Sequence, residues 1–418
     1  MILLLKLAAA SLRSRALTVG LTVFAVALSV ALLLGVEKAR TGAKASFADT
    51  ISDTDLIVGA RSGQVPLLLY AVFRIGNATN NITWESYQDI IGRPGIAWAV
   101  PISLGDSHRQ FRVMGTTQAY FERYKYRGGR ALAVADGALF DDLFDAVIGA
   151  DVAAQLGYAV GDPIVVAHGI ASFLDHADTP FRISGILEKT GTPVDRTVLV
   201  SLEAIEAIHV DWQSGAQRPG APTPVEVIRQ MDLTPKAITA AMLGVQSRLQ
   251  IFSVQRAIND YPNEPLLAIL PGVALQELWG IVGIAETALV GVSVMVVVTA
   301  LLGLAAMLLA GLSARRREMA IFRAMGAGPA AIMGLLMTEA VLMALCGAVL
   351  GIAFLYGGLV VLQPILDTRF GLFIPITGIG VPEALVVLTV VAAAALVSLI
   401  PSIRAYRISL ADGMTVKM

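Results

Sequence analysis

The stretch Ser313-Ala-Arg-Arg-Arg-Glu-Met-Ala-Ile-Phe-Arg-Ala-Met-Gly-Ala327 joins two long apolar runs of this chain. Its three consecutive arginines, Arg315 to Arg317, directly follow an uncharged run that is about as long as a membrane is thick. A soluble protein has no reason for this placement. A loop that leaves a bilayer on its cytoplasmic side, in contrast, carries an excess of Lys and Arg. The stretch therefore predicts a membrane protein and indicates which side of the membrane this loop faces.

The composition of the whole chain supports this prediction. The 418 residues are 56% hydrophobic and only 15% charged, with a mean hydropathy of +0.71. Soluble domains average about 25% charged residues. The single cysteine, Cys346, lies inside an apolar run, so an intrachain disulfide is excluded and the cysteine count says nothing about the redox compartment.

Four apolar runs are long enough to cross about 30 Å of hydrocarbon. They extend over Ala16 to Val36, Thr287 to Ala314, about Ala330 to Leu359, and Ala384 to Ile403. The third is interrupted only by Glu339, and the fourth contains Pro401 near its end, where a kink or a helix stop costs least. The sequence thus predicts one span, a domain of roughly 240 residues, and three further spans.

Basic residues predict the orientation of these spans. Of the 11 Lys and Arg outside residues 37–279, 10 fall on one side of the membrane if the four spans alternate. By the positive-inside rule both termini are cytoplasmic, the large domain is extracytoplasmic, and Val361 to Glu383 forms a short outer loop. A cleaved signal peptide is disfavoured, because the first apolar run is long for one and three further spans follow.

Residues 37–279 are expected to form a folded α+β domain in water. This region carries 20 Lys and Arg against 26 Asp and Glu, a net charge of −6, and mixes apolar and polar residues. Expected strands lie at Pro163–Ala167, Phe181–Leu187 and Thr197–Val200, and expected helices at Asp151–Leu156 and Pro235–Asn259. A β-rich insert is expected at about 135–215, and Gln213 to Pro224 is interpreted as a linker.

The stretch from Leu56 to Phe73 is unusually apolar for this domain. One interpretation is a buried strand and turn of the core. The other is a loop that contacts lipid or a client, because Gly59, Gly63 and Pro66 interrupt the period of two that a core strand would show. The residues that would make this contact are Leu67, Leu68, Leu69, Tyr70 and Phe73.

The sequence lacks the P-loop motif and the common hydrolase and metalloprotease motifs, so energy for active transport must come from a partner or an ion gradient. His168, His176, Asp178 and His209 form a candidate metal site, because imidazole and carboxylate are zinc ligands. Their spacing matches no known ligand motif, and surface histidines are common. The alternative is therefore that these are ordinary surface histidines without a metal.

Glu339 is the one carboxylate well inside an apolar span. An ionised group at the bilayer centre costs about 2.5 to 3.5 kcal/mol on insertion scales, so it should face protein or water. It is expected to pair with an arginine, with a proton relay as the alternative. In the same span, Gly347-x-x-x-Gly351 permits close contact with a neighbouring helix.

Two motifs together resemble the permeases of MacB/FtsX/LolC-type (type VII) ABC transporters. Arg315 to Ala327 is similar to the family segment R-R-x-E-[IM]-[AG]-x-x-[RK]-A-[LM]-G-A, which is followed in the next helix by an acidic residue, here Glu339. Val147 to Asp162 resembles the family's G-x-x-[VL]-A-x-x-L-G-x-x-x-G-D passage. MacB itself carries a fused ATPase domain that this chain lacks, and Ser409 stands where a proline is common.

The resemblance implies an α-helical membrane protein with four transmembrane helices and a MacB-like periplasmic domain between the first and second. It further implies a permease subunit without enzymatic activity or cofactors of its own, working as a homodimer or heterodimer with two copies of an ATPase that binds ATP and Mg. A periplasmic binding or adaptor protein and membrane lipids are further expected partners, and nucleic acid is not. The expected location is the bacterial inner membrane.

The residues expected to couple to the ATPase are Arg315, Arg316, Arg317, Glu318, Arg323 and Gly326. Closure of the ATPase would push on this segment, and the first two spans would relay the motion to the outer domain. The alternatives are an FtsX-like regulator of a cell-wall hydrolase, a metal-related envelope transport system, a membrane receptor and a secondary transporter.

Overall fold

The computed structural model describes residues 2–51, 53–169, 176, 178–213, 216–217, 222–314, 318, 321, 324–370, 374, 376 and 378–407. The chain divides into two compact units. The membrane unit consists of Met1–Ala43, Gly283–Ile365 and Ile374–Met418, and the outer domain of Lys44–Val282 and Leu366–Phe373.

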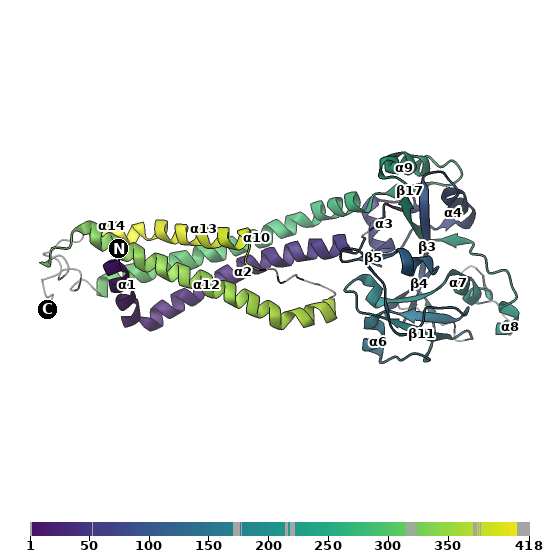
Figure 1. The fold of residues 1–418 in the computed structure, drawn as a ribbon, viewed down its shortest axis with the longest axis horizontal. Helices are drawn as coiled ribbons and strands as arrows, with labels where there is room; N and C mark the ends of the chain where they lie inside the picture. Colours follow the sequence, from purple (N-terminus) through teal and green to yellow (C-terminus); the bar gives the residue numbers. More distant parts are fainter. Residues whose placement is uncertain are drawn as a thin grey trace. The chain divides into compact units, whose positions relative to one another are not determined.

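Helices build the membrane unit (Figure 1). They are α1 (Ile2–Ser14), α2 (Ala16–Asp49), α10 (Pro271–Ala314), α12 (Pro329–Phe370), α13 (Val381–Val397) and α14 (Leu399–Arg407). In the part of the chain that is described, four helical stretches are long and apolar enough to cross a membrane. They are Ala16–Asp49, Pro271–Leu312, Ala330–Leu366 and Val381–Ala405, which confirms the one-plus-three arrangement of spans.

Three helix boundaries differ from the expected ones. Helix α10 begins at Pro271, ahead of the uncharged run that starts at Thr287, and α12 continues to Phe370, so the first part of the segment expected as an outer loop from Val361 is helical. The cause is that apolar residues and good helix formers continue past the length needed for the membrane. Span four divides at Ser398 into α13 and α14. Pro401 lies in the first turn of α14, where a backbone N–H has no partner within the helix, so the proline costs no helical hydrogen bond.

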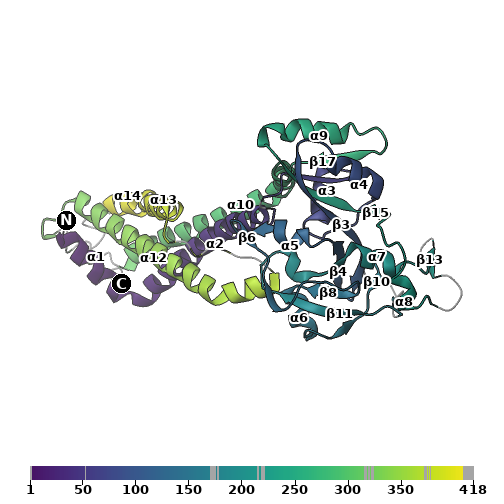
Figure 2. The ribbon, with the colours of Figure 1, turned by 45° about the vertical axis from the view of Figure 1, so that its right-hand side comes forward.

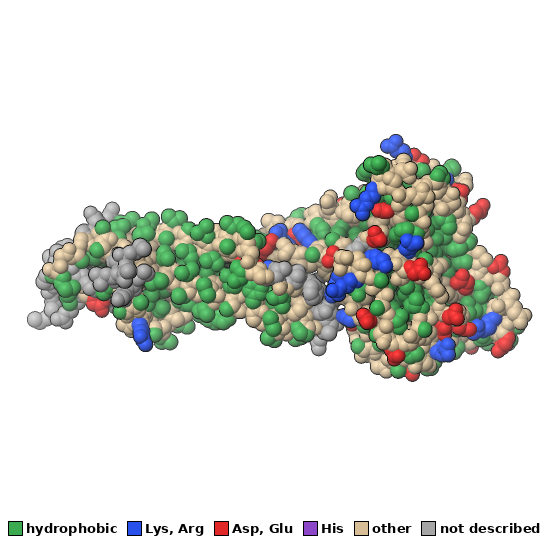
Figure 3. Space-filling view, viewed as in Figure 1, with side chains coloured by type: hydrophobic (Ala, Val, Ile, Leu, Met, Phe, Trp, Pro, Cys, Tyr) green, Lys and Arg blue, Asp and Glu red, His purple; other side chains and the backbone are tan. Residues whose placement is uncertain are grey.

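Small residues allow the membrane helices to pack closely. A Cβ added to Gly347 would lie 2.7 Å from the Val26 side chain, and one added to Gly351 would lie 2.6 Å from the Ala27 carbonyl oxygen. The G-x-x-x-G pair of α12 therefore forms a close contact with α2, as expected. On the face that Figure 3 shows, hydrophobic side chains cover much of the membrane unit, whereas charged side chains of both signs are scattered over the outer domain.

The outer domain is built on one mixed sheet (Figure 2), which confirms an α+β fold between the first two spans. The order in this 11-stranded sheet is β17-β1-β16-β3-β4-β12-β8-β11-β7, with β10 paired to β3 and β9 to β11. The strands are β1 (Leu56–Ala60), β3 (Ile96–His108), β4 (Phe111–Thr116), β7 (Val134–Gly137), β8 (Asp145–Ile148), β9 (Pro163–Ile164), β10 (Ala167–His168), β11 (Phe181–Leu187), β12 (Thr197–Ser201), β16 (Ala240–Val245) and β17 (Leu266–Ile269).

Shorter elements surround this sheet. The helices are α3 (Gln64–Ala71), α4 (Trp84–Ile91), α5 (Ala119–Arg123), α6 (Ala150–Leu156), α7 (Leu202–Ile208), α8 (Val225–Ile228) and α9 (Ile251–Asn259). Three small pairs are β2 (Ile82–Thr83) with β15 (Ala237–Ile238), β5 (Lys125–Tyr126) with β6 (Arg130–Ala131), and β13 (Trp212–Gln213) with β14 (Ala216–Gln217). Two 3₁₀ turns lie at Pro193–Arg196 and Arg248–Gln250.

The central strands are apolar on both faces because both faces are covered. Leu56 and Val58 of β1 pack into one core cluster, and Ile57 packs into the cluster on the opposite face. Gly59 follows in this strand because a Cβ there would lie 2.5 Å from Leu67 and 2.8 Å from the Tyr70 hydroxyl. The interruption of the period of two is thus the place where α3 lies directly on the sheet.

Several expected elements are confirmed and one is wrong. Strands β11 and β12 and helix α6 lie where the sequence predicts them, and the predicted strand Pro163–Ala167 divides into β9 and β10. The long helix expected over Pro235–Asn259 does not form, since its first half is strands β15 and β16 and only α9 is helical. Strand β16 pairs with β1 and β3 on its two sides, so sheet pairing outweighs the helical pattern of this segment.

The segment 135–215, expected as a β-rich insert, contributes strands to the same sheet and belongs to the same compact unit. The expected linker Gln213–Pro224 falls partly outside the described residues, and its described part includes β14.

Candidate functional site

Four ionisable side chains meet at the end of β10. Asp106, His168, His176 and His209 each offer a ligand atom, and these four atoms lie within 4.8 Å of one another. His168 Nδ1 lies 3.2 Å from Asp106 Oδ1 and 3.3 Å from His209 Nε2, and His209 Nε2 lies 3.7 Å from Asp106 Oδ1. We call these four residues the histidine cluster.

The sheet places the first two members of the cluster. In the antiparallel pair of β10 and β3, His168 lies directly opposite Asp106. The register of β3 against β4 shifts between Leu104 and Ser107, so Asp106 sits in a bulge. A β-bulge changes the direction of a side chain and is common beside functional sites. Here it brings a carboxylate to the imidazole of the neighbouring strand.

The other two members come from outside the sheet. His209 follows directly after α7, and its Nδ1 lies 2.6 Å from the Ile205 carbonyl oxygen. Because a carbonyl accepts, Nδ1 carries the proton and Nε2 presents its lone pair to the cluster. The backbone N–H of His176 donates to the Val166 carbonyl at 2.8 Å, which holds His176 beside β10.

Burial keeps one imidazole neutral. Burial, followed by the neighbouring His209 and His168, lowers the pKa of His176 to about 4, against the opposing effect of Asp106. At pH 7 this ring is therefore uncharged and its lone pair is available. In the described part of the chain, Nε2 of His168 and Nε2 of His176 are buried without a hydrogen-bond partner.

The structure changes the membership of the candidate metal site. His168, His176 and His209 do meet, but Asp178 is exposed and is not among the grouped ligand atoms. Asp106 takes its place. Asp106 could not be predicted from the sequence, because it lies far from the histidines in the chain and only the pairing of β3 with β10 brings it near.

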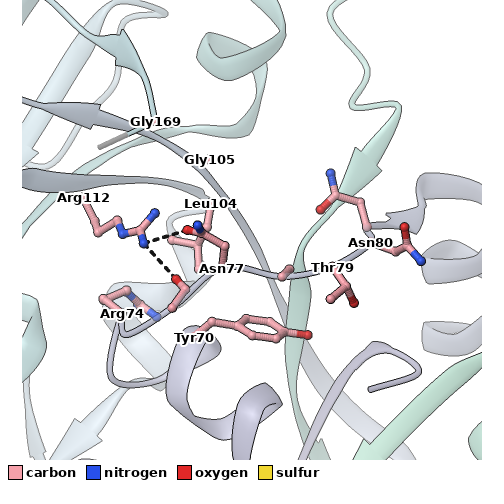
Figure 4. A pocket seen from close by; sticks show the side chains of 12 residues that line it. Tyr70, Arg74, Asn77, Thr79, Asn80, Leu104, Gly105, Arg112 and Gly169 are labelled. Atoms are coloured by element: carbon pink, nitrogen blue, oxygen red, sulfur yellow. Dashed lines mark hydrogen bonds between the residues drawn. The ribbon is translucent and has the colours of Figure 1, made fainter. Parts of the chain in front are cut away.

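A pocket of about 590 Å³ lies in the outer domain, and Gly105 and Gly169, the chain neighbours of Asp106 and His168, are among its lining residues (Figure 4). Arg74 and Arg112 line it, together with Tyr70 and the segment 76–81. Arg112 Nη2 donates to the Gly76 carbonyl and to Asn77 Oδ1, both at 2.8 Å. Burial and then the charge of Arg74 lower the pKa of Arg112. One wall of the pocket is thus positively charged, and the Gly76 carbonyl and Asn77 Oδ1 hold the Arg112 guanidinium in place.

The apolar stretch is part of the core. Leu67, Leu68, Tyr70 and Phe73 are buried in one cluster, and Leu69 is only partly buried against it. The helix α3 turns these side chains onto β1, where Gly59 leaves room for them. The geometry therefore favours the core interpretation over contact with lipid or a client, although the expected strand is a helix in this part.

The coupling segment is described only in part. Arg315, Arg316, Arg317 and Arg323 lie outside the described residues. Glu318 is helical and exposed, and Gly326 has a φ of 92°, a left-handed conformation that favours glycine and ends the helical stretch before it. Their expected role in coupling stays a prediction.

Glu339 has partners within the membrane unit. Its side chain is fully buried, Ser11 Oγ donates to Oε1 at 2.5 Å, and Arg15 Nη2 lies 3.4 Å from Oε2. Glu339 therefore pairs with an arginine, as expected. The arginine precedes the first span, and it joins α2 to α12.

A second ion pair, which could not be predicted from the sequence, involves the buried carboxylate of Glu383. Lys38 Nζ lies 2.7 Å from Glu383 Oε1, and the Tyr356 hydroxyl donates to the same oxygen at 3.2 Å. The backbone N–H of Gly380 donates to the other oxygen at 2.9 Å. Only the fold places these groups together, because α2, α12 and α13 each contribute one side chain.

Two family models match this chain. The model for the MacB-like periplasmic core domain matches residues 19–241, and the model for the FtsX-like permease C-terminal region matches residues 290–410. No individually curated protein matches the chain at a significant level.

Solved structures similar to the outer domain include two bacterial transporter domains. The extracellular domain of the noncanonic ABC-type transporter YknZ from Gram-positive bacteria is 16% identical, with a TM-score of 0.29 over 52% of this chain and 99% of that chain. The periplasmic region of MacB from Actinobacillus actinomycetemcomitans is 10% identical, with a TM-score of 0.34 over 56% of this chain and 97% of that chain.

The family matches and the arrangement of spans define a membrane permease component of ABC transporters. The chain belongs to the MacB/FtsX-type permease family, because the match to the periplasmic core domain alone covers more than half of the chain. Proteins of this family are inner-membrane proteins that function with cytoplasmic ABC ATPases.

Proposed function

We propose that this chain is the permease subunit of an ATP-driven transporter that transmits motion from a separate cytoplasmic ATPase to its outer domain. Two permease copies and two ATPase copies form the working unit, and the ATPases bind the ATP and Mg. The moved domain exports or extracts a client of the cell envelope. The observation that carries the proposal is the match to both a MacB-like core domain and an FtsX-like permease region in one chain.

The lengths of two helices support this mechanism. Helix α2 has 34 residues and α10 has 44, so at 1.5 Å per residue they are about 51 and 66 Å long. Hydrocarbon is only about 30 Å thick. Both helices are therefore longer than a span requires, and a rigid helix that continues beyond the membrane can relay a displacement at one end to the other.

The Glu339 ion pair supports the coupling step. Arg15 lies directly before α2, and Glu339 lies in α12, the first helix after the coupling segment. A push on the coupling segment would move the start of α12, and this buried pair would transfer the movement to α2. The pair thus gives the relay a physical contact between the two helices.

The coupling segment is tested by removing its charges. In the full chain reconstituted with its ATPase, Glu318→Ala combined with Arg323→Ala should abolish stimulation of ATP hydrolysis by the permease, while membrane insertion stays intact. The matched control is Glu203→Ala with Arg248→Ala, which removes the same two charges from exposed positions of the outer domain. Stimulation that survives the first pair of substitutions would place the docking site elsewhere.

The partner is tested by purification from native membranes. A co-purifying P-loop ATPase is expected under this proposal. A cell-wall hydrolase recovered in its place would favour the regulator alternative.

The orientation is tested by cysteine labelling. In a Cys346→Ala background, single cysteines at Ser214 and Ser313 should react with an impermeant maleimide from opposite sides of sealed vesicles, because 10 basic residues share one side. Labelling of both positions from one side would contradict the four-span orientation with cytoplasmic termini.

A further inference from the structure

We propose that Asp106, His168, His176 and His209 bind a divalent first-row transition-metal ion, and that this ion is zinc. The site is independent of the coupling to an ATPase, since all four ligands lie in the outer domain. It rests on the spacing of the donor atoms, on their chemistry and burial, and on the tautomer of His209.

The spacing of the donor atoms matches four-coordinate zinc. With Zn–N and Zn–O bonds of about 2.0 to 2.1 Å, neighbouring ligands at the corners of a tetrahedron lie about 3.3 to 3.4 Å apart. The three measured separations among Asp106 Oδ1, His168 Nδ1 and His209 Nε2 are 3.2, 3.3 and 3.7 Å. These three separations are close to those of one face of such a tetrahedron, and the ligand atom of His176, which lies within 4.8 Å of each of the three atoms, would supply the fourth corner.

The chemistry of the donors selects the class of ion. Three imidazoles and one carboxylate suit zinc, copper, nickel and iron, whereas calcium and magnesium require oxygen ligands and more of them. Thiolate, which soft ions prefer, is not among the grouped donors. With neutral imidazoles, the carboxylate of Asp106 leaves the zinc complex with one net positive charge.

The tautomer of His209 is already set for metal binding. His209 donates from Nδ1 to the Ile205 carbonyl, so its Nε2 lone pair faces the cluster. A ligating histidine usually donates its other ring nitrogen to a carbonyl or carboxylate in this way.

Burial distinguishes this cluster from an ordinary group of histidines. His176 is only 4% exposed, and its Nε2 has no partner among the described residues. His108, which is 5% exposed in the same domain, contacts the Val165 carbonyl at 2.6 Å and the Tyr158 hydroxyl at 2.9 Å with its two nitrogens. A buried nitrogen without a partner is destabilising, and a metal ion would remove that penalty.

The ring of Trp212 closes the cluster on one side. Its centroid lies 4.4 Å from that of His168 and 4.9 Å from that of His176. An apolar ring beside the ligands limits the access of water and strengthens their interaction with an ion.

Zinc would connect four separate segments of the outer domain. Asp106 belongs to β3, His168 to β10 and His209 to the end of α7, while His176 lies in the connection that leads to β11. Four protein ligands fill a tetrahedral shell, which is the pattern of a closed structural site and not of a catalytic one. Zinc binding should therefore stabilise the outer domain.

The test uses the untagged full chain in detergent, stripped with EDTA and then titrated with ZnCl₂. One zinc per chain should remain after desalting, as measured by inductively coupled plasma mass spectrometry, and zinc should raise the melting temperature. Asp106→Asn and His176→Gln should each weaken binding by about 100-fold or more, because even substitutions behind the ligands cost 10- to 100-fold. Co²⁺ in place of zinc should give the visible spectrum of a four-coordinate ion.

The matched control is Asp178→Asn, a carboxylate two residues from His176 that lies outside the cluster. It should bind zinc as the wild type does. Melting temperatures distinguish lost binding from misfolding. A variant that folds but cannot bind zinc should melt at the temperature of the EDTA-treated wild type, and a misfolded variant should not. His209→Gln provides a second ligand variant for that comparison. The proposal is overturned if the wild type retains no zinc, or if Asp178→Asn lowers the stoichiometry and Asp106→Asn does not.

Discussion

Buried polar groups are arranged differently in the membrane unit and in the outer domain. In the membrane unit, the carboxylate of Glu339 is paired with Arg15, and that of Glu383 is paired with Lys38. In the histidine cluster, two buried ring nitrogens lie without a partner in the described part of the chain. In the first arrangement each carboxylate has its cation within the protein, whereas in the second the buried Nε2 of His176 has no partner among the described residues until a ligand is added.

The difference follows from the solvent on the outside of each unit. A charge that faces lipid cannot be hydrated, so a carboxylate in a span needs its partner within the chain at all times. The outer domain is expected to lie in water, from which an ion can enter and leave. Paired charges therefore indicate structural contacts between helices, and unpaired donors that face one another indicate a binding site.

The largest loss of stability is expected when a charge is buried with neither a protein partner nor a ligand. Leu68→Asp places a carboxylate in the fully buried core beneath α3, which costs several kcal/mol, roughly the whole stability of a domain. Limited proteolysis of the full chain in membranes should show that the outer domain is digested.

The control for this substitution is Leu69→Asp, one position along the same helix, where the side chain is only partly buried. The outer domain should remain resistant to protease in this variant. Protection in both variants, together with loss of transport, would instead favour a client or lipid contact for this stretch.

An intermediate effect is expected when one partner of a buried pair is removed. Arg15→Met removes the guanidinium beside the buried carboxylate of Glu339, which should destabilise the membrane unit by about 3 to 5 kcal/mol. The double variant Arg15→Met, Glu339→Gln removes both charges and should recover most of this loss.

Denaturation of the detergent-solubilised protein measures both variants. If the single substitution is as stable as the wild type, the pair has no structural role. If the double variant is stable but no longer stimulates its ATPase, the pair serves the relay between α12 and α2.

The smallest effect is expected for an ion pair in water. Arg229 and Asp142 of the outer domain form two hydrogen bonds of 2.7 Å, but both side chains are more than 40% exposed. Arg229→Ala should therefore lower stability by only about 0.2 to 1 kcal/mol, and less at high salt.

The pH dependence of this pair has a definite sign. Arg229 lowers the pKa of Asp142 below its ordinary value of 3.8. A lowered pKa in the folded state stabilises the protein above the ordinary value, and this stabilisation is lost as the pH falls through the lowered value. Melting curves of wild type and Arg229→Ala should thus differ at pH 6 and converge only as the pH falls below the lowered pKa of Asp142. A difference that persists in acid would mean that packing of the arginine against Phe144 is responsible.

Properties that depend on local composition were determined by the sequence alone. The four spans and the family resemblance could be predicted because hydropathy, basic residues and the motif from Arg315 to Ala327 are all read along the chain. The strands β11 and β12 could be predicted for the same reason, since short β-branched runs between turn residues need no distant information.

Properties that depend on pairing across the chain were decided only by the tertiary structure. The segment from Ala240 to Val245 is a strand because β1 and β3 lie on its two sides, although its pattern favours a helix. Asp106 joins the histidines because a bulge and the register with β10 direct it there. A residue's own sequence neighbourhood carries no record of which segment will lie beside it, and so the ligand set and the ion pairs appear only when the chain is folded.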